Sequence, residues 1–361
     1  MSKIFINGLS CISPQPTFTE EFPMTLLDHS LENVLCAIEP SYKEYISPAA
    51  SRRMAKGVKM GTTTAMTSLK QAGISLPDAI VVGTGLGCIQ DSEKFLKGIL
   101  DNQEQHLTPT SFIQSTHNTV AGQIALNLQC KGLNFSYVNG AVSFESALLE
   151  SILLIQTEGL HHILVGAVDE HAPHTIYLYE LSGAIKSKEA LQQPSPTSGI
   201  RMGEGATFFV LSDTFGEETL AELVDVTFCN QLENNSIEHF THTFLSREGL
   251  ELSDIDLIVS GRNENQDDTP YFENFEHLFP NATSLIYKHL TGEFFTASAI
   301  GTWLGCQALQ GKEIPKAFFL RNNPDKPLQY VLLYNQYLGR EHSLVSVSYT
   351  HLRAHETGRN L

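Results

Sequence analysis

The chain has 361 residues, of which 42% are hydrophobic and 17% charged, a balance typical of one large globular domain or two modest ones. Acidic residues outnumber basic ones by 40 to 23, and the net charge of −17 makes nucleic acid or an anionic membrane surface a poor partner. No apolar run approaches the roughly 20 residues that cross a bilayer, so no membrane span is expected. The six cysteines lie far apart, as reduced core thiols of a cytoplasmic protein do, and they suggest no metal site.

Strand-like apolar runs alternate with helical segments in the first half of the chain. Strands are predicted over 3–9, 79–83, 134–138, 162–168 and 206–211, with helices over 52–73, 90–101, 116–129 and 142–157. The stretch 192–199 is rich in Gln, Pro and Ser and is predicted to be a loop.

The second half repeats this alternation. Strands are predicted over 222–229, 256–260, 284–287, 316–320 and 330–335, and helices over 236–248, 270–278 and 294–310. Alternating strands and helices favour an α/β fold whose sheets are covered by helices. A polar segment around 213–220 marks a boundary, so we expect one half over 1–215 and another over 216–346.

The last fifteen residues, 347–361, show no periodicity that continues the preceding pattern. We interpret them as a non-native tail of the kind produced by adapter read-through, and we expect the second half to be truncated near Val345. An ordinary disordered tail is the alternative interpretation.

Five motifs occur in a fixed order along the chain. A glycine turn at 83–87 follows a strand, and a segment over 108–128 contains Ala-Gly-Gln-Ile-Ala at 121–125. The run Tyr-Val-Asn-Gly-Ala-Val-Ser then covers 137–143, Arg-Met-Gly-Glu-Gly-Ala covers 201–206, and a segment over 288–299 begins with Lys288. A nucleotide-binding fold competes for the glycine turn, but this turn lacks the third glycine and the acidic residue which that fold needs.

Together the motifs resemble those of condensing enzymes, the β-ketoacyl synthases, over roughly residues 1–345. The resemblance implies a thiolase-like α/β fold with αβαβα layers built from two similar halves. The segments 52–59 and 111–118 are most similar to ketosynthase-like and chain-length-factor proteins of aryl-polyene and flexirubin-type pigment clusters.

The resemblance also implies that catalytic groups are missing. In the family a cysteine on a strand-to-helix turn carries the acyl chain, and helix N–H groups lower its pKa. Val142 stands at that position and has no nucleophilic atom. Ser143 is one residue away and would need a base to activate it, so we consider it only as a displaced nucleophile.

The two family histidines, which donate hydrogen bonds to an enolate, are also replaced. The first motif falls at Gly261, and Glu293 stands at the second histidine of the K-S-x-x-G-H segment. An ionised carboxylate cannot donate, and only a strongly raised pKa would rescue it. Lys288 is retained, and its alternative interpretation is a structural ion pair with Glu293. Substitution of the histidines by His117, His171 or His174 is a further, weaker alternative.

We therefore predict a non-catalytic, chain-length-factor-like subunit that pairs with an active ketosynthase. Phe112, Ile113, Gln114 and Thr116 are expected to line the acyl tunnel, with plain interface or core packing as the alternative. No cofactor is expected; the substrates of the complex would be phosphopantetheine thioesters of an acyl-carrier protein. The carrier should dock mainly on the partner, although Arg52, Arg53, Lys56 and Lys59 form a local basic cluster.

Two other functions remain open from the sequence. One is an active 3-oxoacyl synthase that uses unusual residues, which leaves the question of enzyme activity unsettled. The other is a thiolase-fold binding or scaffold protein with no role in a tunnel. Chain expressed without a partner is expected to aggregate or form a homodimer, because an orphan interface exposes apolar surface.

Overall fold

The computed structural model describes residues 3–19, 25–105, 107, 109–232, 236–323 and 327–349. Within these ranges the strands form one sheet in the order β3-β2-β4-β5-β1-β6-β11-β10-β7-β8-β9. The strands are β1 (Ile4–Ile12), β2 (Ala79–Gly83), β3 (Leu133–Tyr137), β4 (His162–Asp169), β5 (Gly205–Ser212), β6 (Ala221–Asn230), β7 (Leu257–Ser260), β8 (Thr283–Ile286), β9 (Phe319–Arg321), β10 (Tyr330–Tyr337) and β11 (Glu341–Ser348).

The α-helices are α1 (Pro48–Ser51), α2 (Lys56–Gln71), α3 (Ile89–Asp101), α4 (Pro109–Gln114), α5 (Thr119–Leu128), α6 (Ser143–Glu158), α7 (Pro173–Leu181), α8 (Lys188–Leu191), α9 (Ile237–Ser246), α10 (Thr269–His277), α11 (Lys288–Thr291) and α12 (Ser298–Leu309). The short 3-10 turns are η1 (Tyr42–Glu44), η2 (Gly140–Val142), η4 (Leu252–Asp254) and η5 (Lys316–Phe318).

The sheet consists of two halves with the same topology. Strands β1, β5, β4, β2 and β3 follow one another across the first half, and β6, β11, β10, β7 and β8 repeat that order in the second. In each half, the first two strand pairs in this order are antiparallel and the last two are parallel. The halves meet where β1 pairs with β6. The connection between them, 213–220, contains the predicted boundary at 215/216.

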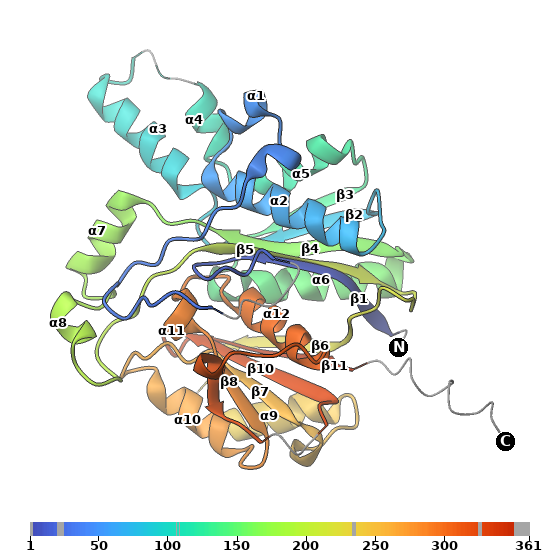
Figure 1. Ribbon diagram of the computed structural model, residues 1–361. Coiled ribbons are helices and arrows are strands. Elements are labelled where there is room, and N and C mark those ends of the chain that lie inside the picture. Colours follow the sequence, from blue (N-terminus) through green and yellow to red (C-terminus); the bar gives the residue numbers. More distant parts are fainter. Residues whose placement is uncertain are drawn as a thin grey trace.

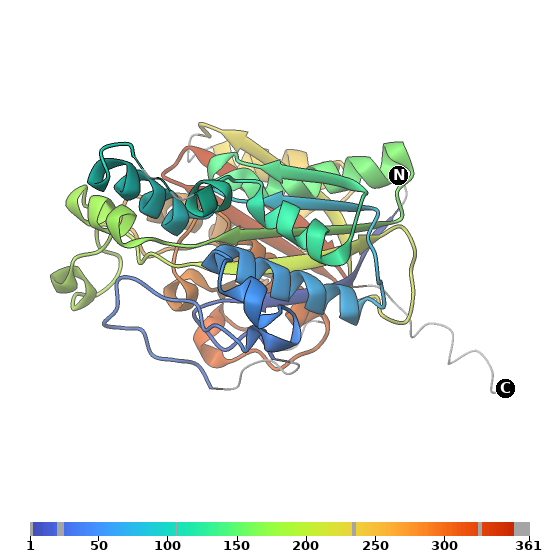
Figure 2. The same ribbon diagram turned by 90° about the horizontal axis from the view of Figure 1, so that it is seen from above.

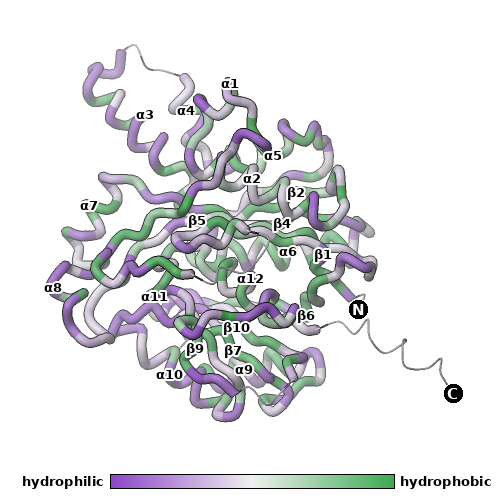
Figure 3. The backbone as a smooth tube through the Cα atoms, viewed as in Figure 1, coloured by the Kyte–Doolittle hydropathy of each residue, from purple (hydrophilic) through white to green (hydrophobic). Residues whose placement is uncertain are grey.

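Five layers are visible in Figure 1. Helices α6 and α12 lie between the two half-sheets, α2 and α5 cover the outer face of the first, and α9 and α10 cover the outer face of the second. Separate apolar clusters fill the central layer and each outer layer, and Figure 3 shows hydrophobic segments gathered in the strands at the centre. The predicted αβαβα architecture built from two similar halves is confirmed.

Helix α3 agrees with the helix predicted over 90–101, and it exposes Leu96 and Leu100 while Asp91 is its buried residue. Several sequence predictions need correction. Segment 316–320 is mostly a 3-10 turn, and α7, α8 and α11 were not predicted. Strand β11 runs to Ser348, so the first two residues of the suspected tail belong to the sheet. Residues 350–361 lie outside the described part of the chain.

The cysteines agree only partly with the prediction of core thiols. Cys11, Cys88 and Cys306 are buried, whereas Cys130 and Cys229 are half-buried and Cys36 is exposed. Among the described residues, no helix has both the length and the apolar character needed to cross a bilayer.

Candidate functional site

The turn between β3 and α6 holds the position expected for the nucleophile. The 3-10 turn Gly140–Val142 leads directly into α6, so Val142 precedes the first turn of that helix. Its side chain is 2% exposed. A helix N-terminus stabilises a thiolate at such a place, but the valine side chain has no atom that ionises or attacks a thioester. No acyl-enzyme can form at Val142.

Ser143 does not replace the missing thiol. Its hydroxyl donates to the Gly140 carbonyl at 2.7 Å and accepts from the Asn139 N–H at 2.8 Å. The side chain is fully buried, and both hydrogen bonds close the turn on itself. Ser143 therefore stabilises the turn, and within the described part of the chain no general base is hydrogen-bonded to it.

A carboxylate from the second half binds the same turn. Glu341, at the start of β11, accepts a hydrogen bond from the Ala141 N–H at 2.6 Å. Gly140 has a φ of 54°, and a Cβ at that position would lie 2.5 Å from Glu341 Oε1. Glycine is needed here both for the positive φ and for the approach of Glu341. Sequence reasoning missed this contact, because Glu341 lies 200 residues away from Ala141.

Lys288 and Glu293 form a buried ion pair in the second half. The Lys288 ammonium donates to Glu293 Oε2 at 2.7 Å and to Asn335 Oδ1 at 2.6 Å, and both charged residues are 2% exposed. Burial raises the pKa of Glu293, while Lys288 counteracts that rise. The alternative interpretation of Lys288 as a structural ion-pair partner is confirmed. Glu293 acts here as an acceptor of hydrogen bonds.

The position of the first expected histidine has no room for a side chain. Gly261 follows β7, and a Cβ built on it would lie 2.5 Å from Asn335 Oδ1. The Asn335 amide therefore occupies the space into which a histidine at 261 would project.

A set of amide side chains completes this buried polar network. Asn263 Nδ2 donates to Glu293 Oε2 at 3.0 Å and to Asp268 Oδ2 at 2.8 Å, and Asn265 Nδ2 also donates to Asp268 at 3.1 Å. These residues were missed from the sequence. The polar run 263–268 directly after a buried strand could have indicated them. Polar side chains next to a buried strand must be hydrogen-bonded to one another or to other buried groups.

The space beside Glu293 is almost filled. A cavity of about 20 Å³ is lined by Glu293, Phe294, Phe295, Tyr337 and neighbouring residues. That volume holds about one water molecule. The Phe295 and Tyr337 rings lie 5.1 Å apart, and a Cβ on Gly85 would lie 2.3 Å from the Phe295 side chain. As folded, this interior cannot accommodate an acyl chain.

Asp169, at the end of β4, joins the two halves at the edge of this cavity. Its Oδ1 accepts hydrogen bonds from the Thr84 hydroxyl and the N–H groups of Gly85 and Leu86 at 2.9–3.1 Å. Its Oδ2 accepts from the N–H and hydroxyl of Thr296 at 3.1 and 2.8 Å. The glycine turn after β2 therefore binds a carboxylate of the protein itself.

The M-G-E-G-A motif positions the backbone of Glu293. Gly203 N–H donates to the Glu293 carbonyl at 2.9 Å, and Glu293 N–H donates to the Arg201 carbonyl at 2.7 Å. A Cβ on Gly203 would lie 2.2 Å from the Thr291 carbonyl oxygen, so glycine permits the two segments to cross.

The predicted tunnel residues lie away from this interior. Phe112 and Ile113 are exposed on α4, with the Phe112 ring 5.2 Å from that of Phe95. Thr116 is exposed and its hydroxyl lies 2.8 Å from that of Thr119, whereas Gln114 is buried. None of the four predicted residues lines the cavity beside Glu293. A role for them in a tunnel stays a prediction.

The predicted basic cluster is divided. Lys56 binds the buried carboxylate of Glu204, and Lys59 lies 3.8 Å from Glu39 and over the Tyr42 ring. Arg52 and Arg53 are exposed. The suggested substitutes His117, His171 and His174 do not line the cavity beside Glu293 either.

Comparison with known proteins shows what this chain is similar to. Residues 37–191 match the family described as beta-ketoacyl synthase, N-terminal domain. Over this segment, which is less than half of the chain, the sequence is similar to β-ketoacyl synthases. It is 22% identical over 236 residues to a 3-oxoacyl-[acyl-carrier-protein] synthase homolog of Saccharomyces cerevisiae, covering 57% of this chain and 52% of that protein. It is 20% identical over 181 residues to 3-oxoacyl-[acyl-carrier-protein] synthase 2 of Staphylococcus aureus strain N315, covering 47% and 44%. These matches thus span about half the length of the curated relatives.

Solved structures share the fold of this chain over nearly its whole length. The ishigamide ketosynthase/chain length factor has a TM-score of 0.77 at 16% identity and covers 97% of this chain and 100% of its own. A beta-ketoacyl synthase from Burkholderia phymatum STM815 gives 0.78 at 14% identity with the same coverages. A type II PKS acyl-carrier protein in complex with its ketosynthase gives 0.71 at 15% identity, covering 97% and 100%. The fold is that of thiolase-like ketosynthases.

Proposed function

We propose that this chain is a non-catalytic ketosynthase-like subunit that pairs with an active ketosynthase and helps to set product length. The observation that carries the proposal is the side chain at the nucleophile position: Val142 has no reactive atom. The buried ion pair between Lys288 and Glu293 supports the proposal. Glu293 stands where a catalytic histidine is expected, and Lys288 binds its carboxylate within the protein.

The free edge of β3 supports a partner. Among the described strands β3 pairs with β2 only, so its outer edge presents unpaired backbone groups. Leu133, Phe135 and Val138 are exposed along it and after it. An exposed apolar edge strand is a template for pairing with another chain. We infer that β3 forms the centre of the interface with the ketosynthase.

Helices α3, α4 and α7 provide the surface suited to a tunnel wall. They lie on the same side of the molecule in both ribbon views (Figures 1 and 2). Helix α7 carries Tyr177, Leu178 and Leu181, yet none of its residues is buried. Exposed apolar side chains on three helices favour contact with a partner or an acyl chain over contact with water.

Phe112, Ile113, Gln114 and Thr116 would then contribute from α4 and its C-terminal end to a tunnel completed by the partner. The substrates would be acyl-carrier-protein thioesters handled mainly by that partner, and the exposed pair Arg52 and Arg53 is the local basic surface left for carrier contact. The narrower assignment to aryl-polyene or flexirubin-type pigment synthesis rests on the sequence segments 52–59 and 111–118.

Pairing is tested by co-expressing this chain with a ketosynthase encoded beside it and measuring co-purification and sedimentation. Phe135→Lys should abolish the complex and leave the unfolding curve of this chain unchanged. Leu320→Lys, at an exposed leucine of β9, is the matched control and should leave the complex intact. The proposal would be overturned if the parent chain is a stable monomer that co-purifies with no such ketosynthase.

Chain-length control is tested in the reconstituted complex with malonyl-carrier protein. Phe112→Ala should lengthen the product and Phe112→Trp should shorten it, as read by mass spectrometry. Unchanged lengths with an intact complex would favour a scaffold role. Condensation by the purified chain alone would favour the active-synthase alternative instead.

A further inference from the structure

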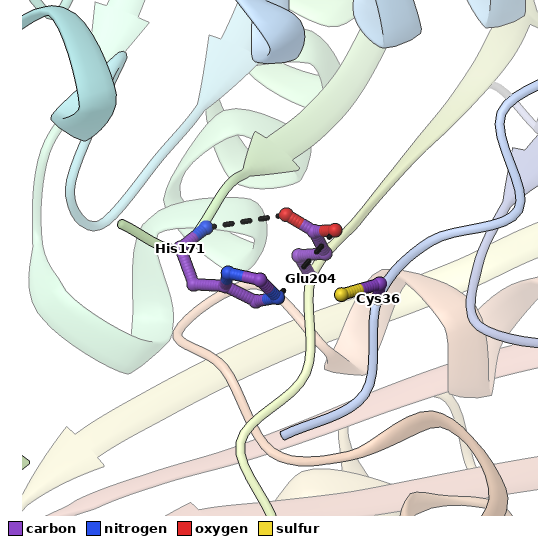
Figure 4. A group of neighbouring side chains, drawn as sticks. All are labelled: Cys36, His171 and Glu204. Carbon is purple, nitrogen blue, oxygen red and sulfur yellow. Dashed lines mark hydrogen bonds and ion pairs between the residues drawn. The ribbon is translucent and has the colours of Figure 1, made fainter. Parts of the chain in front are cut away.

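A cluster of three ligand-type side chains lies outside the site described above (Figure 4). Cys36 lies in the segment before α1, His171 follows β4, and Glu204 precedes β5. One ligand atom from each lies within 4.8 Å of the others, and His171 Nε2 is 3.5 Å from Glu204 Oε1. Figure 4 shows the imidazole, the carboxylate and the sulfur directed toward a common space.

His171 supplies an independent indication of a ligand. The residue is 8% exposed, and its buried Nε2 atom makes no hydrogen bond to a described residue, although Glu204 Oε1 lies 3.5 Å away. Buried polar atoms are almost always hydrogen-bonded, so one that faces a carboxylate without a hydrogen bond is suited to an ion between them. The backbone N–H of His171 donates to Glu204 Oε2 at 3.3 Å, and this hydrogen bond fixes the two residues relative to each other.

The donor types select the metal. Thiolate sulfur, imidazole nitrogen and carboxylate oxygen together suit Zn²⁺, whereas Mg²⁺ and Ca²⁺ prefer oxygen ligands alone. Cys36 is exposed, so an ion can reach the cluster from solvent, and water can supply a fourth ligand.

Lys56 is the competitor for this position. Its ammonium binds Glu204 Oε1, the same oxygen that faces His171. Lys56 Nζ also lies 3.8 Å from Glu39 Oε1, so a second carboxylate is close enough to receive the ammonium when a metal takes Glu204.

We propose that Cys36, His171 and Glu204 form a Zn²⁺ site with one open position. As the Zn–S bond forms, the Cys36 thiol releases its proton to solvent. The site would clip the segment around Cys36 to the start of β5, where the Ala37 N–H already donates to Glu204 Oε1 at 2.9 Å and the Leu35 N–H donates to the Met202 carbonyl at 2.7 Å.

The test is a titration of the full chain, first dialysed against a chelator, with Co²⁺ followed by Zn²⁺. One equivalent of Co²⁺ should produce the near-ultraviolet band of a thiolate–cobalt bond, and Zn²⁺ should remove it. Cys36→Ser should abolish the band and weaken Zn²⁺ binding by at least the roughly 10–100-fold that follows loss of an outer ligand contact. Cys229→Ser, at another partly exposed thiol, should change neither.

Lys56→Met separates the proposed site from chance binding at a thiol. It removes the competing ammonium, so Zn²⁺ should bind more tightly and raise the thermal midpoint further than in the parent chain. Binding that is unaffected by Cys36→Ser, or that does not strengthen in Lys56→Met, would overturn the proposal.

Discussion

The two halves of the molecule share a topology but differ in what their equivalent connections contain. In the first half the connection from β3 to α6 carries Val142, and its hydrogen bonds are made by its own backbone, Ser143 and Glu341. In the second half the connection from β8 to α12 carries Lys288 and Glu293, which are charged and buried.

The two connections therefore differ in chemistry. The first has a valine, whose side chain has no reactive atom, at the position where the resemblance places a cysteine. The second retains charged groups, but Asn263, Asn335 and the ion pair itself satisfy them internally. Val142 is apolar and needs no hydrogen-bond partner when buried. The stability of the second half, in contrast, depends on every member of the charged network being present.

The largest effect is expected for Lys288→Met. It leaves the Glu293 carboxylate buried without its counter-charge, which should cost about 3–5 kcal/mol in the free energy of unfolding. Urea denaturation measures the loss. The double variant Lys288→Met/Glu293→Met removes both charges and should recover most of the stability. If the single variant loses less than about 1 kcal/mol in the free energy of unfolding, the stability of the second half does not depend on this ion pair.

Asp169→Asn tests the link between the halves. The amide group turns one accepting oxygen into a donor that faces N–H and O–H donors, so we expect a loss of about 2–3 kcal/mol. Urea denaturation should show the two halves unfolding less cooperatively. Asp213→Asn, whose carboxylate pairs with the exposed His161, is the control and should change stability little. Equal stability of the two variants would contradict the role given to Asp169.

Gly140→Ala tests the close approach of Glu341 to the nucleophile turn. The positive φ and the contact with the carboxylate should together cost about 1–3 kcal/mol. Removing the carboxylate in Gly140→Ala/Glu341→Ala should relieve the steric part only, which a double-mutant cycle measures as a coupling between the sites. Strictly additive effects would mean that Glu341 does not restrict the turn.

The smallest effect is a pH dependence from Glu170, which accepts hydrogen bonds from the N–H groups of Gly57 and Gln90. Burial, with Asp91 and Glu204 nearby, raises its pKa from 4.5 to about 7. Between these values the native state binds the proton more tightly than the unfolded state, so this contribution to stability falls as pH rises through about 7.

Urea denaturation at about pH 6 and about pH 8 should reveal this fall, and Glu170→Gln should reduce it. An unchanged difference between the two pH values in the variant would assign the dependence to other groups.

The sequence by itself determined the fold class and the paired halves, and it predicted a valine at the position of the nucleophile. Apolar periodicity located most strands, because buried strands need continuous apolar runs. Motif order assigned Val142, Gly261 and Glu293 to the expected catalytic positions, and these assignments stay predictions. The suggestion that Lys288 pairs with Glu293 is confirmed by the structure. These features depend on residue type at one position or on close neighbours in the chain.

Only the tertiary structure decided how the interior is closed. Glu341 reaches Ala141, Asp169 joins Thr84 to Thr296, and Asn335 fills the space at Gly261. Each contact joins segments far apart in the sequence, so no local pattern encodes it. The exposed faces of α3 and α7 have the same cause: an apolar helix predicts burial, but the fold determines whether this chain supplies the covering surface.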